Sequence, residues 1–297
     1  VITNVQHDHP DCYPNPQIYQ DAFFEFANRL KPGGTLVICQ DDPGAAKLGD
    51  SVEKQAGNIR LLRYTGDESG TLSGSYYYAR NTRLNTSGGF SFDFCSSDIP
   101  TALAEVHLKV PGRHNLLNGL AALAAAHCLD LPLAAASEAL SQFEGTDRRF
   151  DLRGEPGGIA LIDDYAHHPV EIMATLQSAR LRYQARRIWA VWQPHTFSRI
   201  QALESAFMDA FKVADRVIMT DVYAAREQNS DFSAATLAAN LHHPNVTFIP
   251  ALSDVTSYLL EHLEPGDVVL ILSAGDADSI NTALLNEIPK INHTKSE

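Results

Sequence analysis

The sequence predicts an α/β protein with two domains. Its 297 residues exceed one typical domain, and 44% of them are apolar, which is enough for two hydrophobic cores. After residue 149, apolar strand-like runs alternate with runs of helical length, which is the pattern of a doubly wound parallel sheet. Before that point, a strand-helix-strand pattern is followed by a β-rich stretch. We therefore expect domains at residues 1–146 and 147–297.

The first domain is predicted to begin with a buried strand at 1–5. Asn15 and Pro16 then open a helix, since they supply an N-cap and a first residue with a preset φ. The apolar residues of this helix recur at helical spacing, namely Ile18, Ala22, Phe26 and Leu30. A second strand is expected at 35–39, so the unit predicts a parallel sheet with a crossover helix.

Residues 58–110 are rich in β-formers and in Gly, Ser and Asn turns. This composition predicts antiparallel hairpins at the sheet margin, whose aromatic side chains we assign to the core rather than to a binding platform. Two helices follow, at about 115–128 and 133–143, because both segments are rich in strong helix formers.

The second domain is expected to place its polar residues along one edge of its sheet. Strands are expected near 159–162, 188–192, 216–220, 246–249 and 268–272, and helices near 169–182, 200–213, 233–241, 253–263 and 278–288. Polar clusters follow four of these strands, at 163–168, 193–199, 221–227 and 273–278. Ligands of open α/β sheets bind at the carboxyl ends of the strands, so these clusters predict a single site.

Composition argues against several classes of partner. Acidic residues outnumber basic ones by 36 to 23, and no run of Lys and Arg occurs, so we expect neither nucleic acid nor an anionic membrane as a partner. No apolar run reaches the roughly 18 residues of a membrane span, and we expect no signal peptide. The four cysteines are scattered, which favours reduced thiols in the cytoplasm. The oligomeric state stays open.

The histidines and arginines near the domain boundary allow two interpretations. His167 and His168 precede Pro169 and could cap a helix, but with Tyr165 nearby we expect at least one of them to contact a ligand. The pair Arg148-Arg149 could be solvated, or it could grip phosphate through its guanidinium forks.

Other candidates lie further from the boundary. His9, taken by itself, is better explained as a turn residue than as a metal ligand. His195 and Arg199 follow a strand and favour a functional role. Asn115 and Asn118 share a helix face, where they could cap the helix or contact a base edge. The chain contains no complete GxGxxG, GxxxxGK[ST] or Gly-x-Ser-x-Gly motif, so neither a dinucleotide fingerprint, a phosphate loop nor a hydrolase elbow is predicted.

Six motifs occur in one order that resembles the Mur ligases. They are Thr3-Asn4-Val5 to Asp8-His9, Pro111 to Asn115 with Asn118, Gly145-Thr146 to Arg148-Arg149-Phe150-Asp151, Asp163 to Pro169, Gln193-Pro194-His195, and Asp221 to Glu227. The resemblance implies the second half of a central ATPase domain followed by a Rossmann-like C-terminal domain. Because Val1 already lies in an expected strand, we expect a fragment that lacks an N-terminal UDP-binding domain and the phosphate loop.

The resemblance implies an ADP-forming ligase of peptidoglycan synthesis in the bacterial cytoplasm. Such an enzyme uses ATP and Mg²⁺ to convert the lactyl carboxylate of UDP-N-acetylmuramate into an acyl phosphate, which the amine of L-alanine attacks. The roles implied are Mg²⁺ binding by His9, nucleotide binding by His114, Asn115, Asn118, Arg149 and Asp164, and binding of the amino acid and acyl phosphate by Tyr165, His167, His195 and Arg199.

The sequence departs from the family pattern at Gln6, at Thr196 and within 273–278. Thr196 replaces an arginine and so removes a cation. No lysine lies between His9 and Lys31, which favours the alanine-adding branch over sister ligases that carry a carbamylated lysine there. The alternatives are a tripeptide-recycling Mur ligase and a non-catalytic nucleotide- or partner-binding relic. We expect the 297 residues alone not to turn over ATP.

Overall fold

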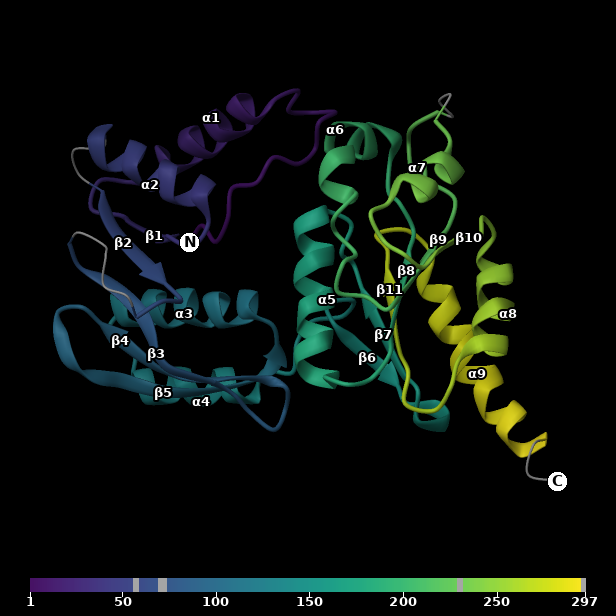
Figure 1. The fold of residues 1–297 in the computed structure, drawn as a ribbon. Coiled ribbons are helices and arrows are strands. Elements are labelled where there is room, and N and C mark those ends of the chain that lie inside the picture. The colour runs from purple at the N-terminus through teal and green to yellow at the C-terminus, as the bar shows by residue number, and fades with distance from the viewer. Residues whose placement is uncertain (56–58, 69–73, 229–231, 295–297) are drawn as a thin grey trace. The chain divides into compact units, whose positions relative to one another are not determined.

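The computed structural model describes residues 1–55, 59–68, 74–228 and 232–294. They form two compact units, Val1–Glu144 (unit 1) and Gly145–Glu297 (unit 2), each with its own sheet and core (Figure 1). The sequence places the boundary after residue 146, and the structure divides the chain after Glu144.

Unit 1 contains a five-stranded sheet in the order β1-β2-β3-β4-β5. The strands are β1 Thr35–Cys39, β2 Arg60–Thr65, β3 Tyr76–Leu84, β4 Gly89–Ser96 and β5 Ile99–Pro111. The predicted antiparallel hairpins are confirmed for β3, β4 and β5. The prediction is wrong for β2, which pairs in parallel with both β1 and β3. A crossover helix joins β1 to β2, and such a connection permits parallel pairing.

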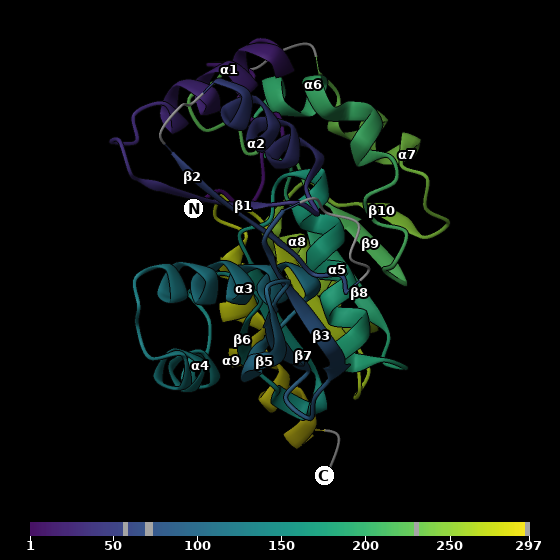
Figure 2. The same ribbon diagram turned by 90° about the vertical axis from the view of Figure 1, so that its left-hand side faces the viewer.

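The helices of unit 1 are α1 Pro16–Ala27, α2 Pro43–Gln55, α3 Arg113–Cys128 and α4 Leu133–Gln142. Figure 2 shows α1 beside α2, and α3 contacts both β1 and α4. The crossover helix α2 is absent from the sequence-based prediction. The expected strand at 1–5 is wrong, because only Ile2 forms a parallel bridge, to Ile38, while the amide of Val5 donates to Asp42 Oδ1 instead.

Helix α1 begins as predicted, because the side chain of Asn15 accepts hydrogen bonds from the amides of Gln17 and Ile18. Its predicted apolar face is wrong at Ile18 and Phe26, although Leu30, just beyond the helix, does pack against the core. Ile18 is 44% exposed and Phe26 is 62% exposed. The residues that face the core are instead Tyr19, Phe23, Phe24 and Ala27.

Unit 2 contains a six-stranded sheet in the order β10-β9-β8-β11-β7-β6. Its strands are β6 Asp151–Gly154, β7 Ala160–Asp164, β8 Ile188–Trp192, β9 Arg216–Met219, β10 Val246–Phe248 and β11 Val268–Leu272. All neighbours pair in parallel except β6, which runs antiparallel to β7. The predicted doubly wound parallel sheet is therefore confirmed, with an unpredicted antiparallel edge strand.

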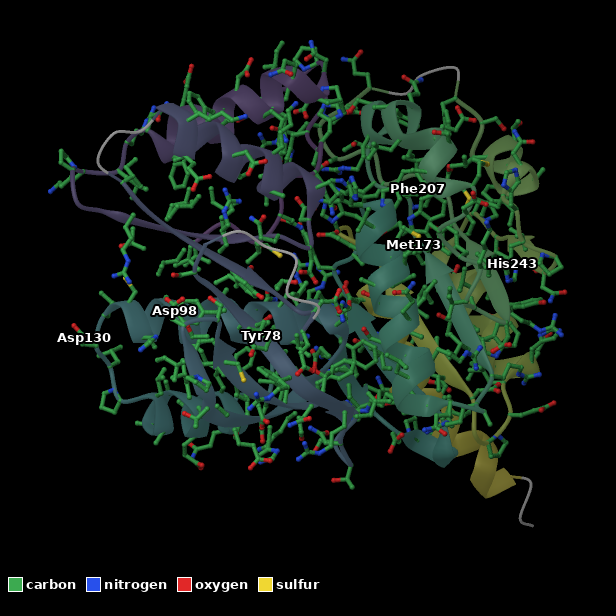
Figure 3. The ribbon with its side chains drawn as sticks, turned by 60° about the vertical axis from the view of Figure 1, so that its left-hand side comes forward. Tyr78, Asp98, Asp130, Met173, Phe207 and His243 are labelled. Carbon is green, nitrogen blue, oxygen red and sulfur yellow. The ribbon has the colours of Figure 1, made fainter. Side chains whose placement is uncertain are left out.

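Helices cover both faces of this sheet. They are α5 Pro169–Tyr183, α6 Phe197–Phe207, α7 Ala234–Asn240, α8 Leu252–His262 and α9 Asp278–Thr294. One core cluster joins alternate strand residues to α5 and α6, where Figure 3 labels Met173 and Phe207. The other joins the remaining strand residues to α8 and α9. Since both faces are buried, the inner strands β8 and β11 are apolar along their whole length, whereas β7 ends in Asp163 and Asp164.

Some predicted boundaries differ from the structure. Helix α6 begins at Phe197, earlier than predicted, and ends at Phe207, with a non-helical residue at Leu203. Helix α9 runs through Pro289 to Thr294, beyond its predicted end near residue 288. All four cysteines are free thiols. Within the described ranges, no helix is both long enough and apolar enough to cross a bilayer.

Candidate active site

The carboxyl ends of β7, β8, β9 and β11 bring together the polar residues of unit 2, as the strand-end rule predicts. We call this group the unit 2 rim. It consists of Arg148, Arg149, Asp163 to Glu171, Gln193 to Arg199, Tyr223, Glu227 and Ser273 to Asp276. These segments lie far apart in the chain, and each follows a strand or flanks one.

A row of four rings crosses the rim. The centroid of the Tyr165 ring lies 5.4 Å from that of His167, which lies 5.7 Å from that of His195. The His195 ring stacks on Tyr223 at 5.7 Å with an interplanar angle of 14°. Backbone hydrogen bonds between the two loops fix this stack, because the amide of Tyr223 donates to Pro194 and that of Thr196 donates to Tyr223. The row therefore joins the loops after three strands.

Two arginines flank the Tyr165 ring, with guanidinium carbons 5.2 Å (Arg148) and 5.6 Å (Arg149) from its centroid. Arg148 donates through Nε to Asp163 at 3.0 Å and through Nη2 to the carbonyl of Ser273 at 2.8 Å. Arg149 is about half exposed, and its Nη1 lies 3.6 Å from Glu171 Oε1. The structure thus gives Arg148 a structural role and leaves Arg149 accessible to a phosphate.

Asp164, the expected ribose contact, is only 5% exposed. Its carboxylate accepts hydrogen bonds from the amides of Phe150 and Ala166 and from Thr175 Oγ1, at 2.8 to 3.0 Å. Burial raises the pKa of Asp164 to about 6, although these three hydrogen bonds act to lower it. The carboxylate fastens the segment before β6 to α5, a geometry that favours a structural role over a ribose contact.

The two adjacent histidines do different things. His168 is the N-cap of α5, where its Nδ1 accepts from the amide of Val170 at 3.3 Å. His167 lies in the ring row, and its Nδ1 is 2.8 Å from the carbonyl oxygen of Tyr165. Glu171 closes a capping box by accepting from the amides of His167 and His168. His168 is therefore the cap of α5, whereas His167 is part of the ring row.

Glu171 is ionised at neutral pH. Burial raises the pKa of its carboxyl, but the His167 and Arg149 charges and two backbone hydrogen bonds outweigh burial and lower the pKa below its usual range. The Oε2 atom lies 3.6 Å from Nδ1 of His167. A fixed negative charge therefore lies beside one face of the ring row.

Arg199 is 4% exposed and places Nη1 2.9 Å from Nδ1 of His195. Both come from the loop and helix after β8. The amide and hydroxyl of Ser198 donate to Glu227, which thereby caps α6. The residue before α6, Thr196, has a φ of 60° and makes no side-chain cap bond.

The absence of a side chain at Gly275 lets the loops of the rim pack closely together. A Cβ at this position would lie 2.5 Å from Gln193 Oε1 and 2.7 Å from Tyr223 Cγ. Gln193 is held on both sides, because it accepts from Ser273 Oγ at 2.6 Å and donates to Asp276 at 2.8 Å. The importance of Gly275, Tyr223 and Glu171 was missed from sequence. Only Glu171 carries a local signal, since it stands at the capping-box position after His168.

Three of the expected nucleotide contacts, His114, Asn115 and Asn118, lie on the first turns of α3 in unit 1. Asn115 donates to the carbonyl of Pro111 at 2.7 Å, and Asn118 donates to Asn115 Oδ1 at 3.3 Å. Asn118 is exposed, as is His114. The amide of Asn115 is thus engaged by the backbone that precedes the helix, whereas Asn118, on the same face, is exposed to solvent.

The expected metal ligand, His9, has a φ of 54° and an exposed side chain. Its Nε2 lies 3.7 Å from Asp8 Oδ2. Nowhere in the described ranges do three or more His, Cys, Asp or Glu side chains gather into a possible metal site. Mg²⁺ commonly keeps several waters and takes one or two protein ligands plus phosphate oxygens. Asp8 and His9 fit a Mg²⁺ site of this kind, in which phosphate oxygens and waters supply the remaining ligands. They do not fit a site whose ligands all come from the protein.

Comparisons with known proteins match both units. The Mur ligase middle domain matches residues 1–126, and the Mur ligase glutamate ligase domain matches residues 148–275. A UDP-N-acetylmuramate–L-alanine ligase of Mycolicibacterium smegmatis is 40% identical over 294 residues, which covers 97% of this chain. The chain spans 58% of the length of that relative.

Solved structures agree with the family matches. The UDP-N-acetylmuramate-alanine ligase MurC of Thermotoga maritima superposes with a TM-score of 0.72 at 26% identity, covering 99% of this chain and 59% of that one. A MurF ligase of Thermotoga maritima, solved in complex with ADP, has a TM-score of 0.68 at 16% identity over 97% of this chain and 62% of that one, a likeness of fold alone. The chain therefore belongs to the Mur ligase family and carries its middle and C-terminal domains.

Proposed function

We propose that the chain is part of a bacterial cytoplasmic, ADP-forming ligase that joins L-alanine to the lactyl carboxylate of UDP-N-acetylmuramate. The observation that carries the proposal is the ring row of the unit 2 rim, with Arg149 at one end and Arg199 beside His195. The name of the 40% identical relative supports the choice of substrates.

The rim has the groups that this reaction requires. Its chemistry converts a carboxylate oxygen into a phosphate leaving group, so cations must bind the transferred charge. The exposed guanidinium of Arg149 is suited to phosphate oxygens, which it can contact at two points. The rings of Tyr165, His167 and His195 provide apolar faces and polar edges for a small amino acid.

Unit 1 would contribute the nucleotide end of the reaction. Asn118, with Asn115 and His114 beside it, offers amide and imidazole groups to the adenine. His9 and Asp8 would hold Mg²⁺ together with phosphate oxygens, where the ion would neutralise phosphate charge. Asp164 is the weakest of the expected contacts, because its carboxylate is engaged within unit 2.

A chimeric enzyme tests the proposal. In this enzyme, which we call the chimera, the present chain replaces the matching residues of the Mycolicibacterium smegmatis ligase. ADP release is measured with ATP, UDP-N-acetylmuramate and one amino acid or peptide at a time. We expect release with L-alanine and little with a tripeptide, with glycine and serine as closer competitors. The 297-residue chain alone is expected to release none, since its sequence has no GxxxxGK[ST] loop. A folded chimera that prefers the tripeptide, or that is inactive with every amino acid, would reject the proposal.

A further inference from the structure

We propose that Tyr223 is a further substrate-binding residue, whose hydroxyl donates a hydrogen bond to the carboxylate of the incoming amino acid. This inference rests on the proposed function and deepens it, since it assigns a contact to one end of that substrate. Tyr223 belongs to the motif Asp221 to Glu227, to which the proposed function gives no role. Its ring is fixed, its hydroxyl is accessible, and the rim offers few other donors to a carboxylate.

The ring of Tyr223 is held by its neighbours. It stacks on the His195 ring at 5.7 Å, and an added Cβ at Gly275 would lie 2.7 Å from its Cγ. The main chain is held as well, because the amide of Tyr223 donates to the carbonyl of Pro194 at 2.8 Å and its carbonyl accepts from the amide of Thr196 at 3.0 Å. A donor on such a ring is oriented before the substrate arrives, which lowers the entropy cost of binding.

The Tyr223 ring lies on the same side of the two loops as the His195 imidazole. The two residues are partners in an isolated parallel bridge, and residues paired across neighbouring strands place their side chains on one face. The interplanar angle of 14° between the two rings agrees with this arrangement. A substrate that contacts His195 therefore comes close to Tyr223.

The Tyr223 hydroxyl has no hydrogen-bond partner among the residues that the structure describes, and its oxygen is accessible to solvent. A phenylalanine could stack on His195 in the same way, so the fold gives the hydroxyl no structural role. A tyrosine hydroxyl can donate one hydrogen bond. It is therefore available to a ligand that carries an acceptor.

The carboxylate of the amino acid needs such a donor. Arg148 is engaged by a buried carboxylate, and Arg149 is assigned to phosphate. Arg199 is buried beside His195. Thr196 stands where the family pattern has an arginine, so this loop carries one cation fewer. A hydroxyl that donates to a carboxylate forms a charge-assisted hydrogen bond, which is stronger than a neutral one.

Kinetics of the chimera with two substrates test the contact. L-alaninamide keeps the amine and the methyl group of L-alanine but replaces its carboxylate with a neutral amide. Tyr223→Phe keeps the ring stack and removes only the hydroxyl. We expect this variant to lower kcat/KM for L-alanine by about 10- to 100-fold, the range for a lost hydrogen bond to a charged group, chiefly through KM. With L-alaninamide the loss should be about 3-fold, since an amide oxygen is a neutral acceptor.

Tyr258→Phe is the matched control. Tyr258 is also a half-buried tyrosine that stacks on a histidine, His262, at 4.0 Å, but it lies on α8, outside the rim. We expect this variant to leave kcat/KM unchanged for both substrates. In Tyr223→Phe, an unchanged kcat/KM for L-alanine would overturn the inference, as would an equal loss with both substrates. A loss of kcat at unchanged KM would also overturn it, because the hydroxyl would then act on the reacting atoms.

Nuclear magnetic resonance tests the contact without turnover. The chimera, labelled with ¹³C at the tyrosine Cζ, is titrated with L-alanine in the presence of ADP and UDP-N-acetylmuramate, and Tyr223→Phe identifies the resonance. We expect this resonance to shift with L-alanine and to shift less with L-alaninamide. A resonance that stays in place with L-alanine would reject the inference, even if the chimera is an active ligase. A wild-type chimera that is inactive with every amino acid would count against the proposed function, and the resonance would still decide the contact.

Discussion

Arg148 and Arg149 are chemically identical neighbours that occupy different environments. Arg148 has a φ of 57° and buries its guanidinium against Asp163, whereas Arg149 faces solvent. The local sequence does not distinguish the two arginines, because the partner carboxylate of Arg148 lies fifteen positions away, on β7, and it was the family resemblance that singled out Arg149. Which arginine is available to a phosphate is therefore a property of the fold.

Removing the two arginines is expected to have unequal effects on stability. Arg148→Ala should lower the free energy of unfolding of unit 2 by about 3–5 kcal/mol, since it leaves the buried Asp163 carboxylate unpaired. Arg149→Ala should cost less than about 1 kcal/mol, because its pair is half exposed. Urea unfolding followed by tryptophan fluorescence reports unit 2, which holds both tryptophans. Equal losses would contradict the assignment.

Asp164 predicts a pH dependence of stability. Burial raises its pKa from 3.8 to about 6 in the folded chain. The folded state then binds the proton more tightly than the unfolded state, so this contribution to stability is present at low pH and is lost as pH rises through 6. Between pH 7 and pH 5, wild type should gain about 1 kcal/mol relative to Asp164→Asn. If wild type instead became less stable relative to Asp164→Asn as the pH falls from 7 to 5, the prediction would be wrong.

The elements that the sequence predicts best are those buried on both faces. Strands β8 and β11 are continuous apolar runs and β7 is apolar as far as Ile162, and the strand-end rule then locates the rim. The short edge strand β6 was missed because its residues are partly or fully exposed and show no apolar run. Helix α2 was missed because few of its residues are apolar and it contains two glycines, Gly44 and Gly49.

The contacts within the site could not be predicted by such local signals. Tyr223 meets His195, and Gly275 meets Gln193 and Tyr223, only because β8, β9 and β11 are assembled in one sheet. Sequence reasoning could place each residue at a strand end, but not its partner.

Two glycines are expected to respond oppositely to alanine. Gly275→Ala should destabilise unit 2 and raise the KM of the chimera for alanine, because the added methyl displaces Gln193 and Tyr223. Gly119→Ala, inside helix α3, meets Leu108 only at 3.4 Å and should be neutral or stabilising by up to about 1 kcal/mol. Thermal unfolding of the two variants measures the contrast. A neutral Gly275→Ala would show that the rim tolerates expansion.

At the scale of the whole molecule, the two units have separate hydrophobic cores. Each core cluster draws its residues from one unit alone. We therefore expect residues 145–297, expressed alone, to fold cooperatively and to keep the native near-ultraviolet circular dichroism of Trp189 and Trp192. A segment that shows helical signal without fixed tryptophan bands would contradict this expectation.

The proposed reaction depends most on the formation of an acyl phosphate, which can be measured directly by isotope transfer. UDP-N-acetylmuramate labelled with ¹⁸O in its lactyl carboxylate is given to the chimera with ATP and ¹⁵N-labelled L-alanine. We predict that mass spectrometry finds one ¹⁸O in the released phosphate and the ¹⁵N in the new amide. Phosphate that carries no ¹⁸O while the amide forms would contradict the account.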